Sequence, residues 1–279
     1  MPLLPRTGRS GLVNRQRRRL PILMGLAGIG LLAHRTATAG PAVEHYVGTA
    51  YDESGRALYT ESHWISEIEG RRELLVLFVC PDGRPFARKQ VRETGVAQAP
   101  SFVLDDARTG YQEGVRETPE GSREVFVRAA RDEPEKRALM KSAPGLVVDA
   151  GFDSFIREHW DALATGAPQH LVFLVPSRLR SYPFTLSLVD DELVDGQPVR
   201  RFVLELDTWY GFAIPPISIA YAPDSKTVRE YRGTANVRDH NGRSLNVRIE
   251  FPAGSRATIA DSRSLVDAKA TGLDGDCTL

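Results

Sequence analysis

The histidines and cysteines are the first residues to examine for chemistry, and their spacing does not fit the common catalytic or metal-binding motifs. The chain contains no His-Glu-x-x-His, no Gly-x-Ser-x-Gly, no phosphate-binding loop and no glycine-rich dinucleotide fingerprint. No two histidines have metal-ligand spacing, and the two cysteines stand far apart, which removes the usual zinc clusters. The sequence therefore predicts no cofactor and no metal. Beyond residue 39, the histidines of the sequence are His45, His63, His159, His170 and His240.

Four weaker candidates for acid–base chemistry remain. The acidic pair Asp105-Asp106 and the run 190–192 fit turns or hairpin tips better than paired catalytic carboxylates. His159 falls on the apolar face of a predicted helix, where a hydrogen-bonded core histidine is the usual role and a base facing a cavity is the alternative. His63 stands beside Trp64, and strand alternation points the two to opposite faces. A hydrolase is therefore the least favoured hypothesis, and an enzyme is not the preferred interpretation.

The two cysteines, Cys80 and Cys277, have two interpretations. In an oxidising compartment they can form a structural disulfide that ties the end of the chain to an early strand. A loop of this length contributes about 4–5 kcal/mol in the chain-entropy model. Alternatively, both thiols stay unpaired, with Cys80 buried in the apolar run before it.

The first 39 residues resemble a cleaved export signal. A cluster of arginines at 15–19 precedes an apolar run from Leu20 to Ala33, and Ala37-Thr38-Ala39 provides the small-x-small pattern of a cleavage site. The apolar run is shorter than the roughly 20 residues needed to cross a bilayer. We therefore expect cleavage after Ala39 and a periplasmic product without a stable membrane span. The segment 16–20 also partly matches a twin-arginine motif.

Removal of this segment changes the charge of the protein. The whole chain balances 36 basic against 36 acidic residues, and residues 1–39 hold seven arginines and no acid. Residues 40–279 therefore carry 29 basic against 36 acidic residues, a formal charge of −7. A mildly acidic protein lacks the positive surface that binds phosphates, so we expect no nucleic-acid partner.

The rest of the sequence is typical of strands separated by tight turns. Asp-Gly at 82–83 and 195–196 and Asn-Gly at 241–242 stand between β-rich runs, and such pairs favour hairpins because both residues tolerate positive φ. Hairpins in series predict a mainly β fold, an antiparallel meander forming a curved sheet or open barrel with one or two packed helices. The clearest predicted strands are Val43–Tyr51, Arg56–Ile68, Leu74–Val79, Phe86–Val91, Phe184–Val189, Val199–Leu206, Val228–Val237 and Leu245–Phe251.

Two segments favour helices. Residues Phe152–Ala164 place aromatic and aliphatic side chains at helical spacing, which predicts an amphipathic helix packed on one face of the sheet. Residues Asp132–Ser142, with Pro134 near the start, predict a short charged helix. We expect one β-rich domain over residues 40–255, and a loosely ordered tail over residues 256–279, which are polar and rich in small residues.

Large aromatic side chains occur in nearly every predicted element. A filled sandwich core would use them, and so would a half-barrel whose walls line an apolar cavity. The segment 209–217 is aromatic but holds Pro215-Pro216, so it is a buried crossover, an edge bend or a flap over the mouth of a cavity. If the interior is hollow, the expected ligand contacts are Phe152, Phe155, Trp160, Trp209 and Phe212.

The last third of the chain resembles a known family. The consecutive strand-like segments 219–224, 231–233, 239–243 and 247–251 are similar to the periplasmic lipoprotein-carrier (LolA/LolB-like) superfamily and to uncharacterised proteobacterial exported proteins. This resemblance implies an open β-barrel with a helical lid over a hydrophobic cavity. It implies no particular functional residue.

Two function hypotheses from different classes follow. The first is a periplasmic protein that binds a lipid or another apolar molecule in a half-barrel cavity. The alternative is a non-enzymatic envelope scaffold that binds another protein, for example by adding a strand to an exposed sheet edge, and it predicts a filled interior.

Overall fold

One long antiparallel sheet organises the protein in the computed structural model, which describes residues 42–209, 211, 214–259 and 262–279. The predicted meander is confirmed: the sheet order is β8-β7-β6-β5-β4-β3-β2-β1-β15-β14-β13-β12-β11-β10-β9, with β16 paired to β1, and the sheet does not close into a barrel. The strands within the described residues are β1 (Val43–Tyr51), β2 (Ala57–Ile68), β3 (Arg71–Val79), β4 (Pro85–Arg92), β5 (Ser101–Asp106), β6 (Tyr111–Glu117), β7 (Arg123–Arg128), β8 (Lys136–Leu139), β9 (Leu146–Val147), β10 (Gln169–Val175), β11 (Arg180–Val194), β12 (Gln197–Leu206), β13 (Ile217–Tyr221), β14 (Val228–Arg238), β15 (Ser244–Glu250) and β16 (Ala257–Ile259).

The predicted hairpins form at the expected turns. Asp195 and Gly196 both have positive φ, 49° and 71°, and they connect β11 to β12, the longest strand pair of the sheet. Gly83 and Gly242 also have positive φ, at the turns of the β3–β4 and β14–β15 hairpins. These turns set the register in which alternate side chains point to the interior.

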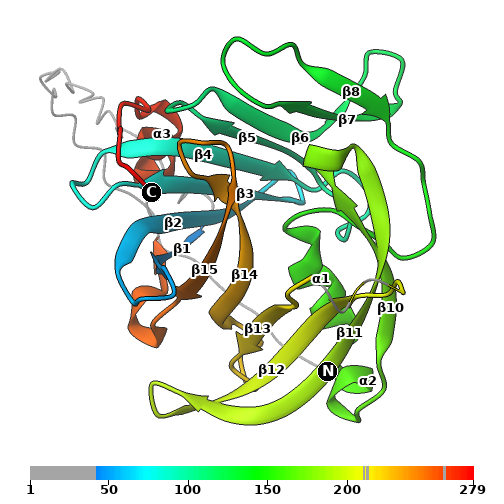
Figure 1. Ribbon diagram of the computed structural model, residues 1–279. Coiled ribbons are helices and arrows are strands. Elements are labelled where there is room, and N and C mark those ends of the chain that lie inside the picture. The colour runs from blue at the N-terminus through cyan, green and yellow to red at the C-terminus, as the bar shows by residue number, and fades with distance from the viewer. Residues whose placement is uncertain (1–41, 210, 212–213, 260–261) are drawn as a thin grey trace, which may run out of the picture. The chain divides into compact units, whose positions relative to one another are not determined.

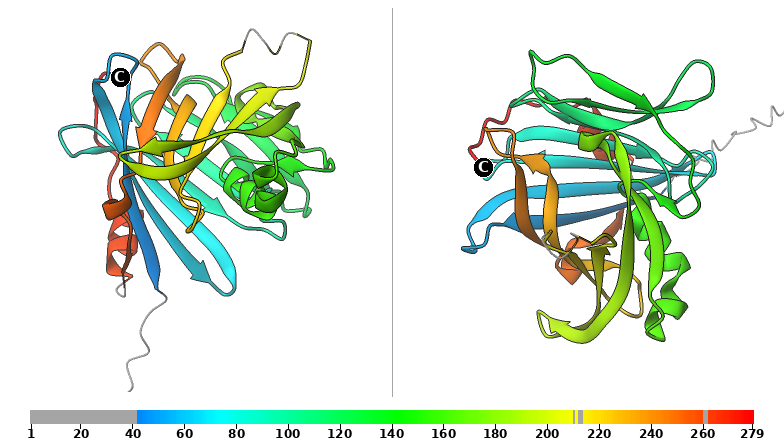
Figure 2. Two further views of the ribbon diagram at one scale, coloured as in Figure 1. Left: turned by 90° about the horizontal axis from the view of Figure 1, so that it is seen from below. Right: turned by 45° about the vertical axis from the view of Figure 1, so that its right-hand side comes forward.

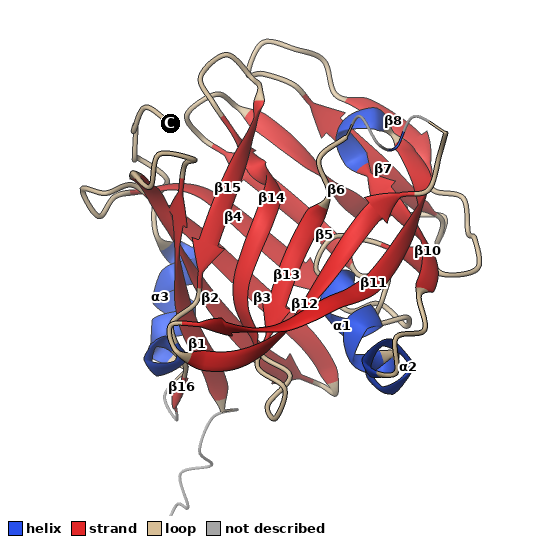
Figure 3. Cartoon of the chain, turned by 60° about the horizontal axis from the view of Figure 1, so that its bottom comes forward, coloured by secondary structure: helices blue, strands red, loops and turns tan. Residues whose placement is uncertain are grey.

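Strand β1 joins two halves of the meander that are far apart in the sequence. It pairs with β2 from Glu44 to Tyr51 and with β15 through Ala50 and Ile249, so the first strand and the last long hairpin lie side by side. The sheet curves, and strands β2–β5 face β11–β13 across an interior (Figures 1 and 3). Pairing at β1 therefore turns two sequential meanders into one curved wall.

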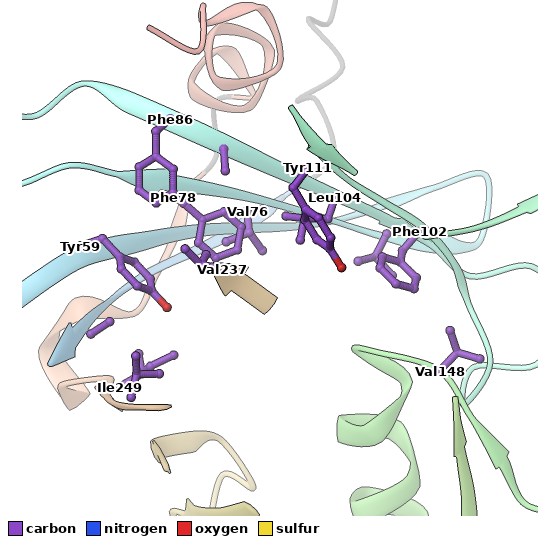
Figure 4. Close-up of a cluster of buried hydrophobic side chains, with 14 of the residues drawn as sticks. Tyr59, Val76, Phe78, Phe86, Phe102, Leu104, Tyr111, Val148, Val237 and Ile249 are labelled. Carbon is purple, nitrogen blue, oxygen red and sulfur yellow. The ribbon is translucent and has the colours of Figure 1, made fainter. Parts of the chain in front are cut away.

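The two ends of the sheet meet through side chains without pairing as strands. Leu146 and Val148, beside the parallel pair β9–β10, belong to the same buried cluster as Val125 and Val127 of β7. The short 3₁₀ turn η1 (Pro176–Arg178) also contacts β6 and β7. Figure 4 shows Val148 and Phe102 in this cluster. The interior is thus walled on this side by apolar packing.

The predicted amphipathic helix forms as two consecutive helices, α1 (Gly151–Glu158) and α2 (Trp160–Ala164), which separate at His159. Their buried face packs against Leu186 of β11 and Phe202 of β12. Gly151 begins α1 against the backbone of residue 98, where an added Cβ would lie 2.0 Å from the carbonyl oxygen of Gln98. A side chain at 151 would therefore push the helix away from the loop between β4 and β5.

The helix predicted over Asp132–Ser142 is wrong. Residues Lys136–Leu139 form the edge strand β8, which pairs with β7 from Glu124 to Val127. Glu135 just before it accepts hydrogen bonds from Arg116, at 2.6 Å between Oε1 and Nη2. The open edge of β7 offers backbone hydrogen bonds over four residues, and this tertiary pairing outweighs the weak helical preference of a short charged segment.

Residues 256–279, for which the composition predicts a loosely ordered tail, contain β16 and helix α3 (Arg263–Ala270) in the structure. Leu265 and Ala268 of α3 pack on Trp64 and Leu75, on the outer face of β2 and β3. Figure 2 shows α3, in red, against the blue and cyan strands. A second, small apolar cluster therefore lies outside the curved sheet. Beyond α3, a disulfide joins Cys277 to Cys80.

Three sequence predictions concern residues outside the described part of the chain: the signal peptide at 1–39, its cleavage after Ala39, and Phe212. Within the described ranges, no helix is both long enough and apolar enough to span a bilayer.

Candidate functional site

A cavity of about 310 Å³ lies inside the curved sheet and opens to solvent. Its walls come from both halves of the meander, from β1–β5 on one side and β10 and β12–β15 on the other, with α1 at one end. Most lining side chains are apolar or aromatic, among them Ile65, Leu74, Phe102, Phe173, Ile219 and Ile249.

Alternation along the strands explains which side chains reach the cavity. In β2, Glu61, His63 and Ile65 line it, whereas Trp64 packs on the outer face beneath α3. This arrangement confirms that His63 and Trp64 point to opposite faces. Two of these three inward side chains, Glu61 and His63, are polar, so β2 brings a polar pair into a mostly apolar wall.

An aromatic group forms the part of the wall around β1. Tyr46 stacks on His63 with 4.5 Å between ring centroids, and Phe251 meets both rings edge-on at 5.8 and 5.6 Å. The guanidinium of Arg256 covers the other side of Tyr46, 3.9 Å from its centroid. Burial raises the pKa of the Tyr46 hydroxyl. Tyr46 is thus a protonated, rigid aromatic surface toward the cavity.

Glu61 and His63 form the clearest acid–base pair of the cavity. His63 Nε2 lies 3.0 Å from Glu61 Oε2, and both residues are buried. In nucleophilic catalysis, a carboxylate often orients a histidine through one ring nitrogen. The other ring nitrogen then accepts a hydrogen bond from the hydroxyl or thiol that acts as the nucleophile. Among the described residues, Nδ1 of His63 has no hydrogen-bond partner. The pair is therefore polar and oriented but lacks an adjacent nucleophile in this part of the chain.

A second polar group enters the cavity from β4 and β14. Lys89 Nζ lies 3.1 Å from Asp149 Oδ1 and 3.4 Å from Asn236 Oδ1. Asn236 donates in turn to Glu113 behind the wall at 3.1 Å, and Tyr111 donates to the other Glu113 oxygen at 2.6 Å. Burial raises the pKa of Glu113, although these two hydrogen bonds act in the opposite direction.

The raised pKa of Glu113 predicts a pH effect on stability. A folded state that raises a carboxyl pKa binds that proton more tightly than the unfolded state, so its contribution is present at low pH and is lost as pH rises through the folded pKa. We expect wild type to lose stability relative to Glu113→Gln as pH rises from about 4, the ordinary carboxyl pKa, through the raised pKa of the folded protein. Urea unfolding of both proteins across this range measures the difference. A constant or opposite difference would contradict the assignment.

Where the cavity meets solvent, one aspartate forms ion pairs with two arginines. Asp153 Oδ2 lies 2.9 Å from Arg157 Nε, one helical turn away in α1, and 3.6 Å from Arg72 Nη1 of β3. The Tyr221 hydroxyl donates to Asp153 Oδ1 at 3.2 Å. The three charged side chains retain 26–38% exposure, which places them at the opening. We call Arg72, Asp153 and Arg157 the mouth cluster.

The ligand contacts expected from the sequence reach different places. Phe152 lines the cavity. Phe155 and Trp160 are buried between the helices and the sheet, where Trp160 lies 5.4 Å from Phe202, and neither lines the cavity. Trp209 is 87% exposed and is also absent from the lining. Helical residues one turn apart thus divide between sheet packing and the cavity, which spacing alone does not resolve.

Apart from His63, the weaker acid–base candidates do not line the cavity. Asp106 pairs with Arg108 at 2.6 Å, and Glu192 pairs with Arg201 at 2.8 Å. His159 stacks on Phe155 and its Nδ1 lies 3.0 Å from the Phe155 carbonyl oxygen, the satisfied core role favoured from the sequence. Within the described residues, no group of three His, Cys, Asp or Glu side chains has metal-binding geometry.

Sequence reasoning missed Lys89 and the mouth cluster. Lys89 carried a usable signal, because it lies in a predicted strand on the same face as Ala87 and Val91, both buried. A charged residue on the apolar face of a strand indicates a buried partner or a polar cavity. Arg72 and Asp153 carried no such signal, since only the fold brings β3 and α1 together.

Comparisons with known proteins leave the family open. No protein-family model matches the chain, and no curated protein matches it. A similar solved structure is a β-barrel-like protein of the domain of unknown function DUF1849 from Brucella abortus, with 11% identity, coverage of 76% of this chain and 95% of that chain, and a TM-score of 0.44. Another is a DUF1329 family protein from Desulfovibrio piger, with 9% identity, coverage of 78% and 85%, and a TM-score of 0.27.

Proposed function

We propose that this protein binds a single-chain apolar molecule, of the lipid or acyl-chain class, in the cavity of the curved sheet. The observation that carries the proposal is the cavity itself, about 310 Å³ in volume, open to solvent and lined mostly by apolar and aromatic side chains. Ligand pockets usually occupy about 300–1,000 Å³, so this cavity suits one chain better than a two-chain lipid.

The interior supports this proposal over the scaffold hypothesis, which predicts a filled core. The apolar walls of an open cavity stay in contact with water. An apolar ligand that covers them gains roughly 25 cal/mol per Å² of apolar area removed from water. The export signal predicted at 1–39 favours a periplasmic location for this activity, and the resemblance to lipoprotein carriers adds the expectation of an acyl ligand.

Filling the cavity tests the proposal. Ala235 of β14 lines the cavity, and Ala235→Phe should weaken binding of the uncharged fluorescent probe N-phenyl-1-naphthylamine at least about tenfold, because the added ring occupies the ligand volume. Ala57→Phe, on an exposed position of β2, is the matched control and should bind as wild type. Ala150→Leu, a second filling variant at the cavity wall, guards against a local effect of Ala235→Phe.

Native mass spectrometry of protein released from the periplasm without detergent adds an independent test. A bound mass that organic solvent removes would support the proposal. Absence of any bound mass, together with equal probe binding by wild type and both filling variants, would overturn it.

A second candidate is recognition of an envelope protein through the β11–β12 hairpin. Val189 and Leu193 of β11 are large apolar side chains that are 57% and 70% exposed. Exposed apolar side chains that lie close together can mark a surface that binds another protein. Crosslinking in the periplasm should then capture a specific partner that Leu193→Lys abolishes. Unchanged capture by Leu193→Lys would exclude this surface.

A further inference from the structure

We propose that the mouth cluster binds the carboxylate of a single-chain amphiphile, through the guanidinium groups of Arg72 and Arg157, while the chain of the ligand enters the cavity. This inference rests on the proposed function and specifies the ligand as a fatty acid or a close analogue.

Hydrogen-bond capacity is the first argument. Both oxygens of Asp153 are already engaged, Oδ2 by Arg157 and Oδ1 by the Tyr221 hydroxyl. Among the described residues, Arg157 donates to a side chain through Nε only, and Arg72 lies 3.6 Å from Asp153 in an ion pair without a hydrogen bond. A guanidinium carries five N–H donors, so most donors of both arginines remain for a further acceptor. A carboxylate matches their planar geometry.

Charge balance is the second argument. The cavity lining includes four Lys or Arg side chains and three Asp or Glu side chains. Lys89 is matched by Asp149, and Arg256 by Glu44 outside the lining. Within the mouth cluster itself, two arginines share one aspartate, so the three side chains carry a formal charge of +1. Glu93 interacts electrostatically with Arg72 without forming an ion pair, and Glu61 lies deeper, beside His63.

Placement is the third argument. In α1, Phe152 lines the apolar cavity while the next residue, Asp153, and Arg157 stand at the opening. In β3, Arg72 lies at the charged mouth and Leu74, two residues further along the same face, lies in the apolar wall. An amphiphile with its chain inside and its head in the partly hydrated mouth satisfies both regions, and it avoids burying a charge in the apolar part.

The experiment compares dodecanoate with dodecanol, which have the same chain and differ in head charge. Each displaces N-phenyl-1-naphthylamine from wild type and from three mouth variants: Arg72→Gln, Arg157→Gln and Asp153→Asn. Dodecanoate should bind about tenfold more tightly than dodecanol, and each arginine variant should remove most of that preference. Asp153→Asn should strengthen dodecanoate binding, because both arginines lose their competing carboxylate.

Arg243→Gln is the matched control, since Arg243 forms the same i,i+4 ion pair with Asp239, at 3.1 Å, away from the cavity lining. It should leave both affinities unchanged. Added salt should weaken dodecanoate binding and spare dodecanol.

The outcomes separate the two proposals. If neither molecule displaces the probe, the proposed function fails. If both bind equally and no mouth variant changes either affinity, the cavity binds apolar chains and the carboxylate site is overturned. Weaker dodecanoate binding by Asp153→Asn would also overturn it, because the cluster would then act only as a structural ion pair.

Discussion

Replacing the disulfide by the double variant Cys80→Ser and Cys277→Ser is expected to lower the free energy of unfolding by about 5 kcal/mol. The bond closes a loop with a sequence separation of 197 residues, and a cross-link of this span removes much of the conformational freedom of the unfolded chain. Urea unfolding measured by circular dichroism gives the difference directly. A decrease below about 1 kcal/mol would show that the bond does not restrict the unfolded state in this way.

The bond is also expected to hold the end of the chain on β4. Gly275 N donates to the Pro85 carbonyl oxygen at 2.8 Å, and Arg108 Nη1 donates to the Cys277 carbonyl oxygen at 3.2 Å. Arg84 Nη1 also donates to the Asp274 carbonyl oxygen at 3.2 Å. Hydrogen exchange after residue 271 should rise strongly in the double variant, because the covalent tie that supports these hydrogen bonds is lost. Reduction of wild type should reproduce the variant, and the same reductant should leave the variant unchanged.

Trp160→Ala is expected to lower the free energy of unfolding by about 4 kcal/mol and to leave ligand binding by the folded protein within about twofold. The Trp160 side chain is 4% exposed and meets Phe202 and Tyr221 edge-on at 5.4 and 6.1 Å. Its removal leaves a cavity between α2 and the sheet. Since Trp160 is absent from the lining of the ligand cavity, binding should depend on it only through folding.

Trp209→Ala provides the control for this prediction. Trp209 is 87% exposed, so truncating it should change stability by less than about 0.5 kcal/mol. Probe titration below the unfolding transition separates the two effects for Trp160→Ala. Loss of binding without loss of stability would make Trp160 a ligand contact and would contradict the packing described here.

The sequence by itself determined the local part of the fold. Asp195-Gly196 and Asn241-Gly242 specified hairpins because these turns need positive φ, which Asp195, Gly196 and Gly242 adopt. Alternation in β2 placed His63 and Trp64 on opposite faces, and helical spacing identified α1 and α2. All of these depend on neighbours within about ten residues, where backbone geometry fixes the outcome.

Tertiary structure alone decided the properties that bear on function. The pairing of Ala50 with Ile249 joins residues far apart in sequence, and β8 forms a strand because β7 offers it an edge. The hollow interior, the division of Phe152 from Phe155, and the meeting of Arg72 with Asp153 all follow from that curvature. A curved sheet with a filled interior and one with a cavity require the same alternation of apolar and polar side chains. The sequence pattern therefore cannot distinguish them, and the distance between the two facing walls decides which forms.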